Sequence, residues 1–199
     1  MNQALIVGLG NPGSTYVGTR HNVGFALLDL FAKKHNLTFR NKSKYQGVLA
    51  KGEILGSQVW LLEPTTFMNL SGISVAAIAQ DLKIAPTETL VIVDDIDLLL
   101  GEVRIKKEGG PGTHNGLRSV EEHLQTNQYA RLRIGIGGPK VHDLAEFVLS
   151  HFSSEETRVL SEVFEKAIQA IEIWLDRGIT RAMDFTNRKN PSNPSNGEP

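Results

Sequence analysis

Short apolar runs alternate with helix-like stretches along most of this chain, and this alternation constrains its fold more than any other feature. Residues 4–9 (ALIVGL) and 89–93 (TLVIV) are apolar runs typical of strands buried on both faces. Residues 23–35 and 153–178 carry apolar side chains at helical spacing. The alternation predicts a single three-layer α/β domain with a mixed, mainly parallel twisted sheet flanked by helices.

The remaining segments follow the same two patterns. Further strands are predicted at 45–51, 58–63, 102–106 and 131–137, and further helices at 67–82, 112–124 and 143–149. Phe67 is interpreted as a core residue at the start of its helix. We expect residues 1–186 to form the domain. Residues 187–199 (NRKNPSNPSNGEP) are polar and rich in proline, which predicts a disordered tail.

Composition excludes several classes of function. None of the 199 residues is Cys, which excludes disulfides, thiolate nucleophiles and Cys-ligated zinc. The N-terminus lacks a basic leader and the apolar runs are short, so we predict a cytoplasmic protein that does not enter membranes. The net charge of −1 is an average, because no acid occurs between Asp29 and Glu53 while six Lys and Arg residues do.

Polar side chains follow the ends of several predicted strands. They include Asn11, Asn69 and Asp94, and the pair His114–Asn115 follows the strand predicted at 102–106, while His21 precedes the helix predicted at 23–35. The carboxyl ends of parallel strands share one edge of a sheet, so we expect these side chains to meet in one cleft. A His–Asp pair can activate a water molecule, and Asn amides can stabilise an oxyanion. No zinc-binding or serine-hydrolase motif accompanies them, and we predict neither a metal nor a cofactor.

Residues 8–13 (GLGNPG) match the glycine pattern of dinucleotide-binding loops. That interpretation needs a helix that opens inside the motif and an acid at the end of a second strand. Here Pro12 and Gly13 precede a weak helix start, and Asp29 lies within a helical pattern. We therefore interpret the segment as a loop at the carboxyl edge of a strand, with a dinucleotide oxidoreductase as the less favoured alternative.

Five segments in order resemble the bacterial peptidyl-tRNA hydrolase family. They are LIVGLGNPGSTYVGTRHNVGF, PTTFMNLSG, VIVDDIDLLLG, GTHNGLRSV and RLRIGIGGP, with DLAEFVLSHF after them, and together they span about residues 5–152. The resemblance implies a monomeric cytoplasmic enzyme of translation without an obligate protein partner. Its partner would be peptidyl-tRNA, held at the acceptor end of the tRNA. It would hydrolyse the ester between the peptide and the 3′ ribose, which recycles peptidyl-tRNA.

The resemblance also implies roles for individual residues. His21 matches the general base that activates water, Asp94 its partner, and Asn11 the residue that positions water or substrate. Residues matched to substrate or tRNA binding are Tyr16, Met68, Asn69, His114, Asn115, Lys106 and Arg133. Arg104, Lys107 and Arg118 are plausible additions to the tRNA path. Glu108, Thr113 and the run Leu98–Leu99–Leu100 depart from the family pattern.

One alternative remains within the same fold. Some plant organellar relatives assist the splicing of group II introns while keeping catalytic-type residues. This chain therefore has a second possible function, as an RNA-binding splicing cofactor without physiological hydrolysis. Hydrolysis of an N-acylated aminoacyl-tRNA by the purified protein distinguishes the two.

Overall fold

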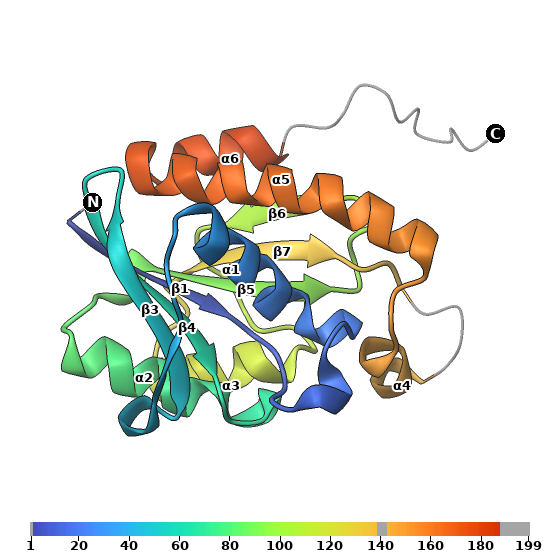
Figure 1. Cartoon of the computed structure of the whole chain (residues 1–199), viewed down its shortest axis with the longest axis horizontal. Coiled ribbons are helices and arrows are strands. Elements are labelled where there is room, and N and C mark those ends of the chain that lie inside the picture. Colours follow the sequence, from blue (N-terminus) through green and yellow to red (C-terminus); the bar gives the residue numbers. More distant parts are fainter. Residues whose placement is uncertain (1, 139–142, 188–199) are drawn as a thin grey trace.

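The computed structural model describes residues 2–138 and 143–187. Seven strands form one twisted sheet in the order β2-β3-β4-β1-β5-β7-β6 (Figure 1). The strands are β1 (Gln3–Gly8), β2 (Arg40–Lys42), β3 (Gly47–Ile54), β4 (Ser57–Pro64), β5 (Thr89–Asp95), β6 (Val103–Lys106) and β7 (Ala130–Gly135). Strands β4, β1, β5 and β7 are parallel neighbours, and only β3 and β6 run against the other five.

Helices cover both faces of the sheet. They are α1 (Val23–Lys34), α2 (Ser71–Asp81), α3 (Asn115–Leu124), α4 (Leu144–Leu149), α5 (Ser154–Arg177) and α6 (Ile179–Asn187). Side chains of α1, α5 and α6 share one apolar core with alternate residues of the strands, such as Ile6 and Ile92. Side chains of α2 and α3 share a second core with the opposite residues, such as Val7 and Val91. The predicted three-layer α/β domain is confirmed (Figure 1).

Most predicted elements are present, with differences at their ends. The strand predicted at 45–51 starts at Gly47 and extends to Ile54, so only Leu55 and Gly56 connect it to β4. The helix predicted at 67–82 divides into a 3-10 turn, Met68–Leu70, and α2. Phe67 is not a core residue, because its side chain is 54 % exposed.

One strand and one α-helix of the described residues were not predicted, and both lie at the edges of the sheet. Strand β2 is a polar, fully exposed edge strand with no hydrophobic pattern to reveal it. Helix α6 follows α5 after Gly178 and lies against β6. The Asn187 side chain accepts from Ile105 N–H at 3.1 Å and donates to Ile105 C=O at 2.9 Å, as a neighbouring strand would. The predicted tail lies outside the described residues from 188 onward.

The chain returns to the carboxyl edge of the sheet after β6. Because β6 is antiparallel to β7, Lys106 lies opposite Arg131, at the start of β7. Residues 107–114 then run back along the sheet, and α3 begins beside the end of β5, where His114 contacts Asp94. The segment therefore reaches the predicted cleft by crossing the sheet face, and not by simply following a parallel strand.

No helix among the described residues is both long enough and apolar enough to cross a membrane.

Candidate active site

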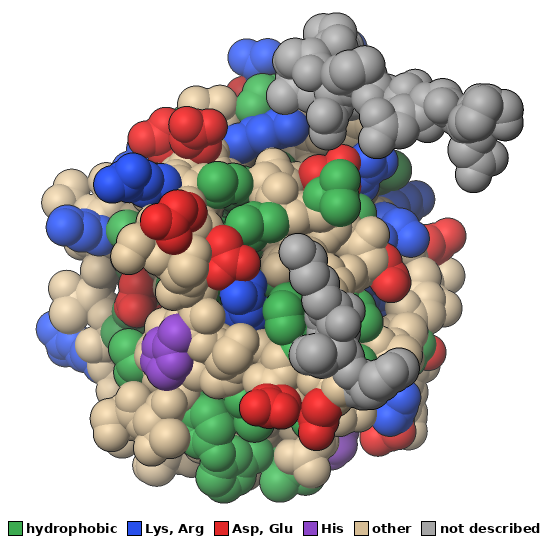
Figure 2. Space-filling view, turned by 90° about the vertical axis from the view of Figure 1, so that its right-hand side faces the viewer, with side chains coloured by type: hydrophobic (Ala, Val, Ile, Leu, Met, Phe, Trp, Pro, Cys, Tyr) green, Lys and Arg blue, Asp and Glu red, His purple; other side chains and the backbone are tan. Residues whose placement is uncertain are grey.

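A cavity of about 730 Å³ lies at the edge of the sheet where β5 and β7 end. Figure 2 views the molecule from this side, where acidic and basic side chains are interspersed. Nine of the ten predicted site residues line the cavity: Asn11, His21, Met68, Asn69, Asp94, Lys106, His114, Asn115 and Arg133. Tyr16 does not line it, but its ring packs edge-on against that of Phe67, which does, at 6.4 Å between ring centroids.

Close packing of α1 on β1 brings His21 to this cavity. A Cβ atom at Gly8 would lie 2.5 Å from the carbonyl oxygen of Gly24, and one at Gly24 would lie 2.5 Å from that of Leu9. Only glycine permits so close an approach at both positions. The 3-10 turn Arg20–Asn22, which leads into α1, is thereby placed beside the end of β5.

The same contacts explain the glycine motif at residues 8–13. Gly8 is the helix contact just described, and a Cβ atom at Gly10 would lie 2.8 Å from the ring of Phe25. Gly13 has φ of +103°, which L side chains rarely adopt. Each glycine therefore has a structural reason that does not involve a dinucleotide, in agreement with the interpretation of the segment as a loop.

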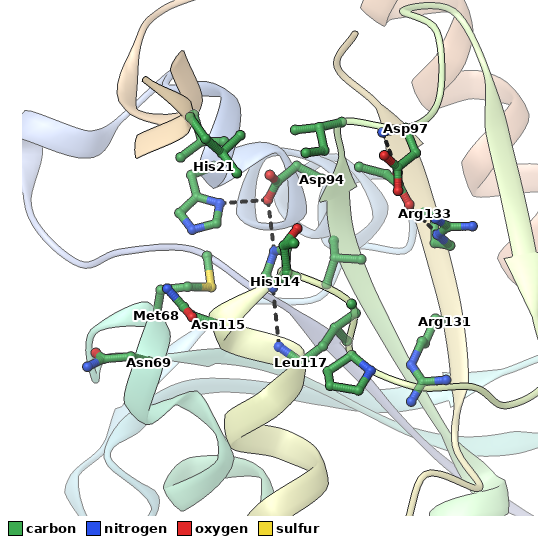
Figure 3. A pocket seen from close by; sticks show the side chains of 18 of the residues that line it. His21, Met68, Asn69, Asp94, Asp97, His114, Asn115, Leu117, Arg131 and Arg133 are labelled. Atoms are coloured by element: carbon green, nitrogen blue, oxygen red, sulfur yellow. Dashed lines mark hydrogen bonds and ion pairs between the residues drawn. The ribbon is translucent and has the colours of Figure 1, made fainter. Parts of the chain in front are cut away.

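His21 and Asp94 form the predicted pair. His21 Nδ1 lies 2.8 Å from Asp94 Oδ1, and the carboxylate is 5 % exposed (Figure 3). Burial raises the pKa of Asp94, but the imidazoles of His114 and His21 more than offset this and hold that pKa well below its usual range. An ionised Asp94 only accepts, so His21 Nδ1 carries the proton. Its Nε2 has no hydrogen-bond partner among the described residues and remains available as a base.

His114 contacts the same carboxylate oxygen but has no nitrogen left for acid–base chemistry. Its Nδ1 accepts from the backbone N–H of Leu117 at 3.2 Å and so caps α3. Its Nε2 must therefore carry the proton, which it donates to Asp94 Oδ1 at 3.1 Å (Figure 3). The structure thus distinguishes the two histidines of the cavity: His21 has a free nitrogen, and His114 fixes Asp94 from the other side.

Ligand atoms of His21, Asp94 and His114 lie within 4.8 Å of one another, a spacing that a metal ion tolerates. Their hydrogen bonds do not suit a metal. A metal at His114 Nε2 would move the proton to Nδ1, which then loses the bond from Leu117 N–H. The donor chemistry of this cluster therefore favours a hydrogen-bonded triad.

Asn11 is held in one orientation. Its Oδ1 accepts from the backbone N–H of Met68 at 2.9 Å, so the amide Nδ2 is free to donate. The Asn22 side chain accepts from Asn11 N–H at 2.8 Å and donates to Asn11 C=O at 2.9 Å. The sequence assigned no role to Asn22, which locks the loop that carries Asn11.

Met68, Asn69 and Asn115 form the wall opposite β7 (Figure 3). Met68 is 5 % exposed, and a Cβ atom at Gly116 would lie 2.5 Å from its sulfur, so this side chain packs tightly on the start of α3. Asn115 Oδ1 accepts from Arg118 at 3.1 Å. The Asn69 side chain is exposed and has no hydrogen-bond partner among the described residues.

Four cations share one face of β6 and β7. In the register of the two strands, Arg104 lies opposite Arg133 and Lys106 opposite Arg131. Arg133 forms an ion pair with Asp95. Lys106, in contrast, has no ion-pair partner among the described residues, and it lines the cavity.

Arg131 is a cavity residue to which the sequence assigned no role. Its side chain is 2 % exposed, and none of its three guanidinium nitrogens has a hydrogen-bond partner among the described residues. Glu121 Oε2 lies 4.0 Å away, and the guanidinium lies 4.3 Å over the Tyr129 ring. The sequence RLR at residues 131–133 could have indicated this residue. Residues two apart on a strand face the same side, so Arg131 is expected on the same face as Arg133.

Arg20 connects the His21 turn to the other end of the chain. Its guanidinium contacts both carboxylate oxygens of Glu156, at 2.8 and 3.0 Å, and lies 4.6 Å from the rings of Phe147 and Phe152. Both bonds come from the Arg20 nitrogen Nη2, and they hold the pKa of Glu156 below its usual range. The residue beside the candidate base is therefore anchored to the start of α5.

Comparison with known proteins agrees with this geometry. A family model described as peptidyl-tRNA hydrolase matches residues 5–194. A peptidyl-tRNA hydrolase of Chloroflexus aggregans is 49 % identical over 94 % of this chain and 98 % of its own length. One of Gloeobacter violaceus is 43 % identical over 98 % of both chains. The crystal structure of peptidyl-tRNA hydrolase from Acinetobacter baumannii superposes with a TM-score of 0.90 at 38 % identity, covering 96 % of this chain and 97 % of that one. Family model, relatives and fold agree, and this chain belongs to the peptidyl-tRNA hydrolase family.

Proposed function

We propose that this protein hydrolyses the ester between the peptide and the 3′ ribose of peptidyl-tRNA, by direct attack of a water that His21 deprotonates. The observation that carries the mechanism is the arrangement of His21, whose Nδ1 is held by Asp94 at 2.8 Å while Nε2 is unpartnered among the described residues. A histidine oriented in this way has one nitrogen available to take a proton from water.

The proposed reaction has two steps. In the first, the water oxygen attacks the ester carbonyl carbon while His21 Nε2 takes the proton, and Asp94 stabilises the resulting imidazolium. In the second, the tetrahedral intermediate collapses and the C–O bond to the ribose breaks. The imidazolium returns its proton to the ribose oxygen, which leaves a free 3′-hydroxyl, the original base and a peptide carboxylic acid. This acid then releases the second proton of the water to the solvent and becomes a carboxylate.

The asparagines supply the donors that the intermediate needs. The free Nδ2 of Asn11 is suited to stabilise the oxyanion, because its orientation is already fixed by Met68 N–H. Asn69 and Asn115 are proposed to pair with the peptide backbone and the terminal ribose, beside Met68 and His114. Such pairing favours an acylated amine over the charged amine of a free aminoacyl-tRNA.

Cations at the β6–β7 side of the cavity are proposed to hold tRNA phosphates. Lys106 and Arg133 were expected there, and the buried Arg131 lies opposite Lys106 in the strand register. Arg133 also pairs with Asp95, so Lys106 has the more accessible charge. Contacts to phosphate carry no sequence information, which suits an enzyme that must accept every tRNA.

In this proposal the residues that bind the tRNA and the residues that hydrolyse the ester line the same cavity. A single copy of the chain therefore carries all the residues that the reaction requires. We infer that the protein acts as a monomer, without an obligate protein partner, in the cytoplasm where peptidyl-tRNA arises.

The deciding experiment measures hydrolysis of an N-acetyl-aminoacyl-tRNA by wild type, His21→Ala and the exposed control His123→Ala. We expect His21→Ala to lower kcat about 10²- to 10⁴-fold, the usual contribution of a general base, with unchanged affinity for deacylated tRNA. His123→Ala keeps wild-type activity. Turnover retained by His21→Ala would remove it as the base. A wild type that binds tRNA without hydrolysis would instead support the splicing-cofactor alternative.

A further inference from the structure

A second cavity, of about 420 Å³, lies next to the first along the same edge of the sheet. The segment that contains β2 and the turn after it forms one side, and the residues before α2 form the other. Phe67 lines both cavities, so its ring stands between them. The second cavity is also lined by Asn41, Gln46, Thr66 and Leu70.

The lining of this second cavity is apolar and hydrogen-bonding but uncharged. Phe67 and Leu70 are unusually exposed for large apolar side chains, at 54 % and 44 %. Thr66 is 8 % exposed, and its Oγ1 has no hydrogen-bond partner among the described residues. The side-chain amides of Asn41 and Gln46 are exposed, and they likewise have no hydrogen-bond partner among the described residues. A buried hydroxyl without a protein partner is uncommon, and a water molecule or a ligand group is its usual partner.

We propose that the second cavity binds the residues of the nascent peptide that precede its C-terminal residue. The proposal rests on the proposed function and extends it. A peptide offers an N–H and a C=O at every residue, which suits the unpaired groups of Asn41, Gln46 and Thr66. Its side chains would cover the exposed faces of Phe67 and Leu70.

The distribution of charge assigns the two ends of the substrate. Lys106, Arg131 and Arg133 line the first cavity on its β6–β7 side, whereas none of the described residues that line the second is charged. Figure 3 shows both arginines on the side of His114 away from Met68 and Asn69. RNA would go to the cations, which leaves the uncharged side for peptide. Lys44 lies near the second cavity in sequence, but it is bound to Asp81 at 2.7 Å.

The test compares two substrates that share the same ester, N-acetyl-alanyl-tRNA and N-acetyl-leucyl-leucyl-alanyl-tRNA. We expect the KM of the wild type to be about three- to tenfold lower for the longer substrate than for the shorter one. One or two additional hydrogen bonds between the peptide and the protein produce a change of this size. The double variant Asn41→Ala/Gln46→Ala and the near-isosteric Thr66→Val are each expected to reduce this advantage. Their kinetics on the short substrate stay at the wild-type level.

Asn127→Ala is the matched control, because Asn127 is an exposed amide that lines neither cavity. The double variant changes exposed residues only, so it tests the proposal even if Thr66→Val folds poorly. The proposal is overturned if wild type shows no preference for the longer peptide, or if the double variant keeps the full preference. A weakened affinity of the double variant for deacylated tRNA would assign the cavity to RNA and overturn it as well. If wild type hydrolyses neither substrate, the proposed function fails, and this inference fails with it.

Discussion

At the scale of single residues, one carboxylate oxygen organises the cavity. Asp94 Oδ1 accepts a hydrogen bond from His21 on one side and from His114 on the other. The two histidines differ only because the backbone N–H of Leu117 occupies the remaining nitrogen of His114. This contact leaves His21 with the free nitrogen, so the identity of the base depends on where α3 begins.

Replacement of Asp94 by Asn tests that arrangement. The amide of the variant would still accept hydrogen bonds, but it would lack the charge that stabilises the imidazolium and fixes the His21 tautomer. We expect Asp94→Asn to lower kcat about 10²- to 10⁴-fold with little change in KM, measured by steady-state hydrolysis of N-acetyl-aminoacyl-tRNA. The exposed control Asp176→Asn keeps wild-type kcat. A change confined to KM would contradict the role.

The sequence was sufficient to predict which residues lie together at the cavity, but not how each side chain is oriented, hydrogen-bonded or buried. The position of His21, Asp94 and Asn11 beside the ends of predicted strands and helices predicted that they would meet at one edge of the sheet, and all three line the same cavity. The orientation of the Asn11 amide depends on Met68 N–H, which is 57 positions away, and no local pattern reveals it. Arg131 was also missed, because burial of an arginine is a tertiary property that composition does not encode.

At the scale of elements, side-chain hydrogen bonds determine several boundaries that periodicity alone misplaced. Residues 112–114 continue a helical pattern, yet α3 starts at Asn115 because His114 caps it. The ends of α5 were predicted closely, since Ser153 and Glu156 form a capping box and Gly178 follows Arg177. Strand β2 and helix α6 were missed, because the first is polar throughout and the second lies beyond that glycine.

The packing of β4 near α1 buries an acid that the proposed reaction does not use. Glu63 is 9 % exposed, and its Oε1 has no hydrogen-bond partner among the described residues. Burial, and to a lesser degree the charge of Asp29 on α1, raise the pKa of Glu63 from 4.5 to about 8. The folded protein therefore keeps a proton on Glu63 at pH values where the unfolded chain has lost it.

This shift predicts how stability depends on pH. The stabilisation from protonated Glu63 is complete below about pH 4.5 and is lost as pH rises toward 8. The loss is about 1.4 kcal/mol of unfolding free energy per pH unit. We expect Glu63→Gln to remove this dependence in urea titrations between pH 5 and 8, and the exposed control Glu53→Gln to keep it. A parallel loss of stability in wild type and Glu63→Gln would contradict the assignment.

At the scale of the whole molecule, the net charge of −1 conceals an uneven distribution of charge. Cations gather on β6 and β7, while the other walls of the cavity are formed by the carboxylates at and after the end of β5 and by amides, imidazoles and apolar groups. A protein without a large positive field can therefore bind RNA through a few placed charges, provided that they line the cavity.

The salt dependence of tRNA binding tests this view. We expect Lys106→Ala to weaken binding and to reduce the slope of log affinity against log salt by about 0.7 to 0.9, the value of one lost phosphate contact. The control Lys33→Ala, on an exposed position of α1 that does not line the cavity, keeps the wild-type slope. An unchanged slope in Lys106→Ala would place the phosphate path elsewhere.

The hydrogen bonds between Asn187 and Ile105 also bear on how this protein behaves among many copies of itself. An open sheet offers unpaired backbone groups at both edges, where strands of other chains can add. Here one edge strand, β2, is only three residues long and carries Arg40 and Lys42, while the other is occupied at Ile105 by an amide side chain. The last residue of α6 thus occupies the backbone groups of Ile105 that a strand of another chain would otherwise use, which protects this edge from strand-to-strand aggregation.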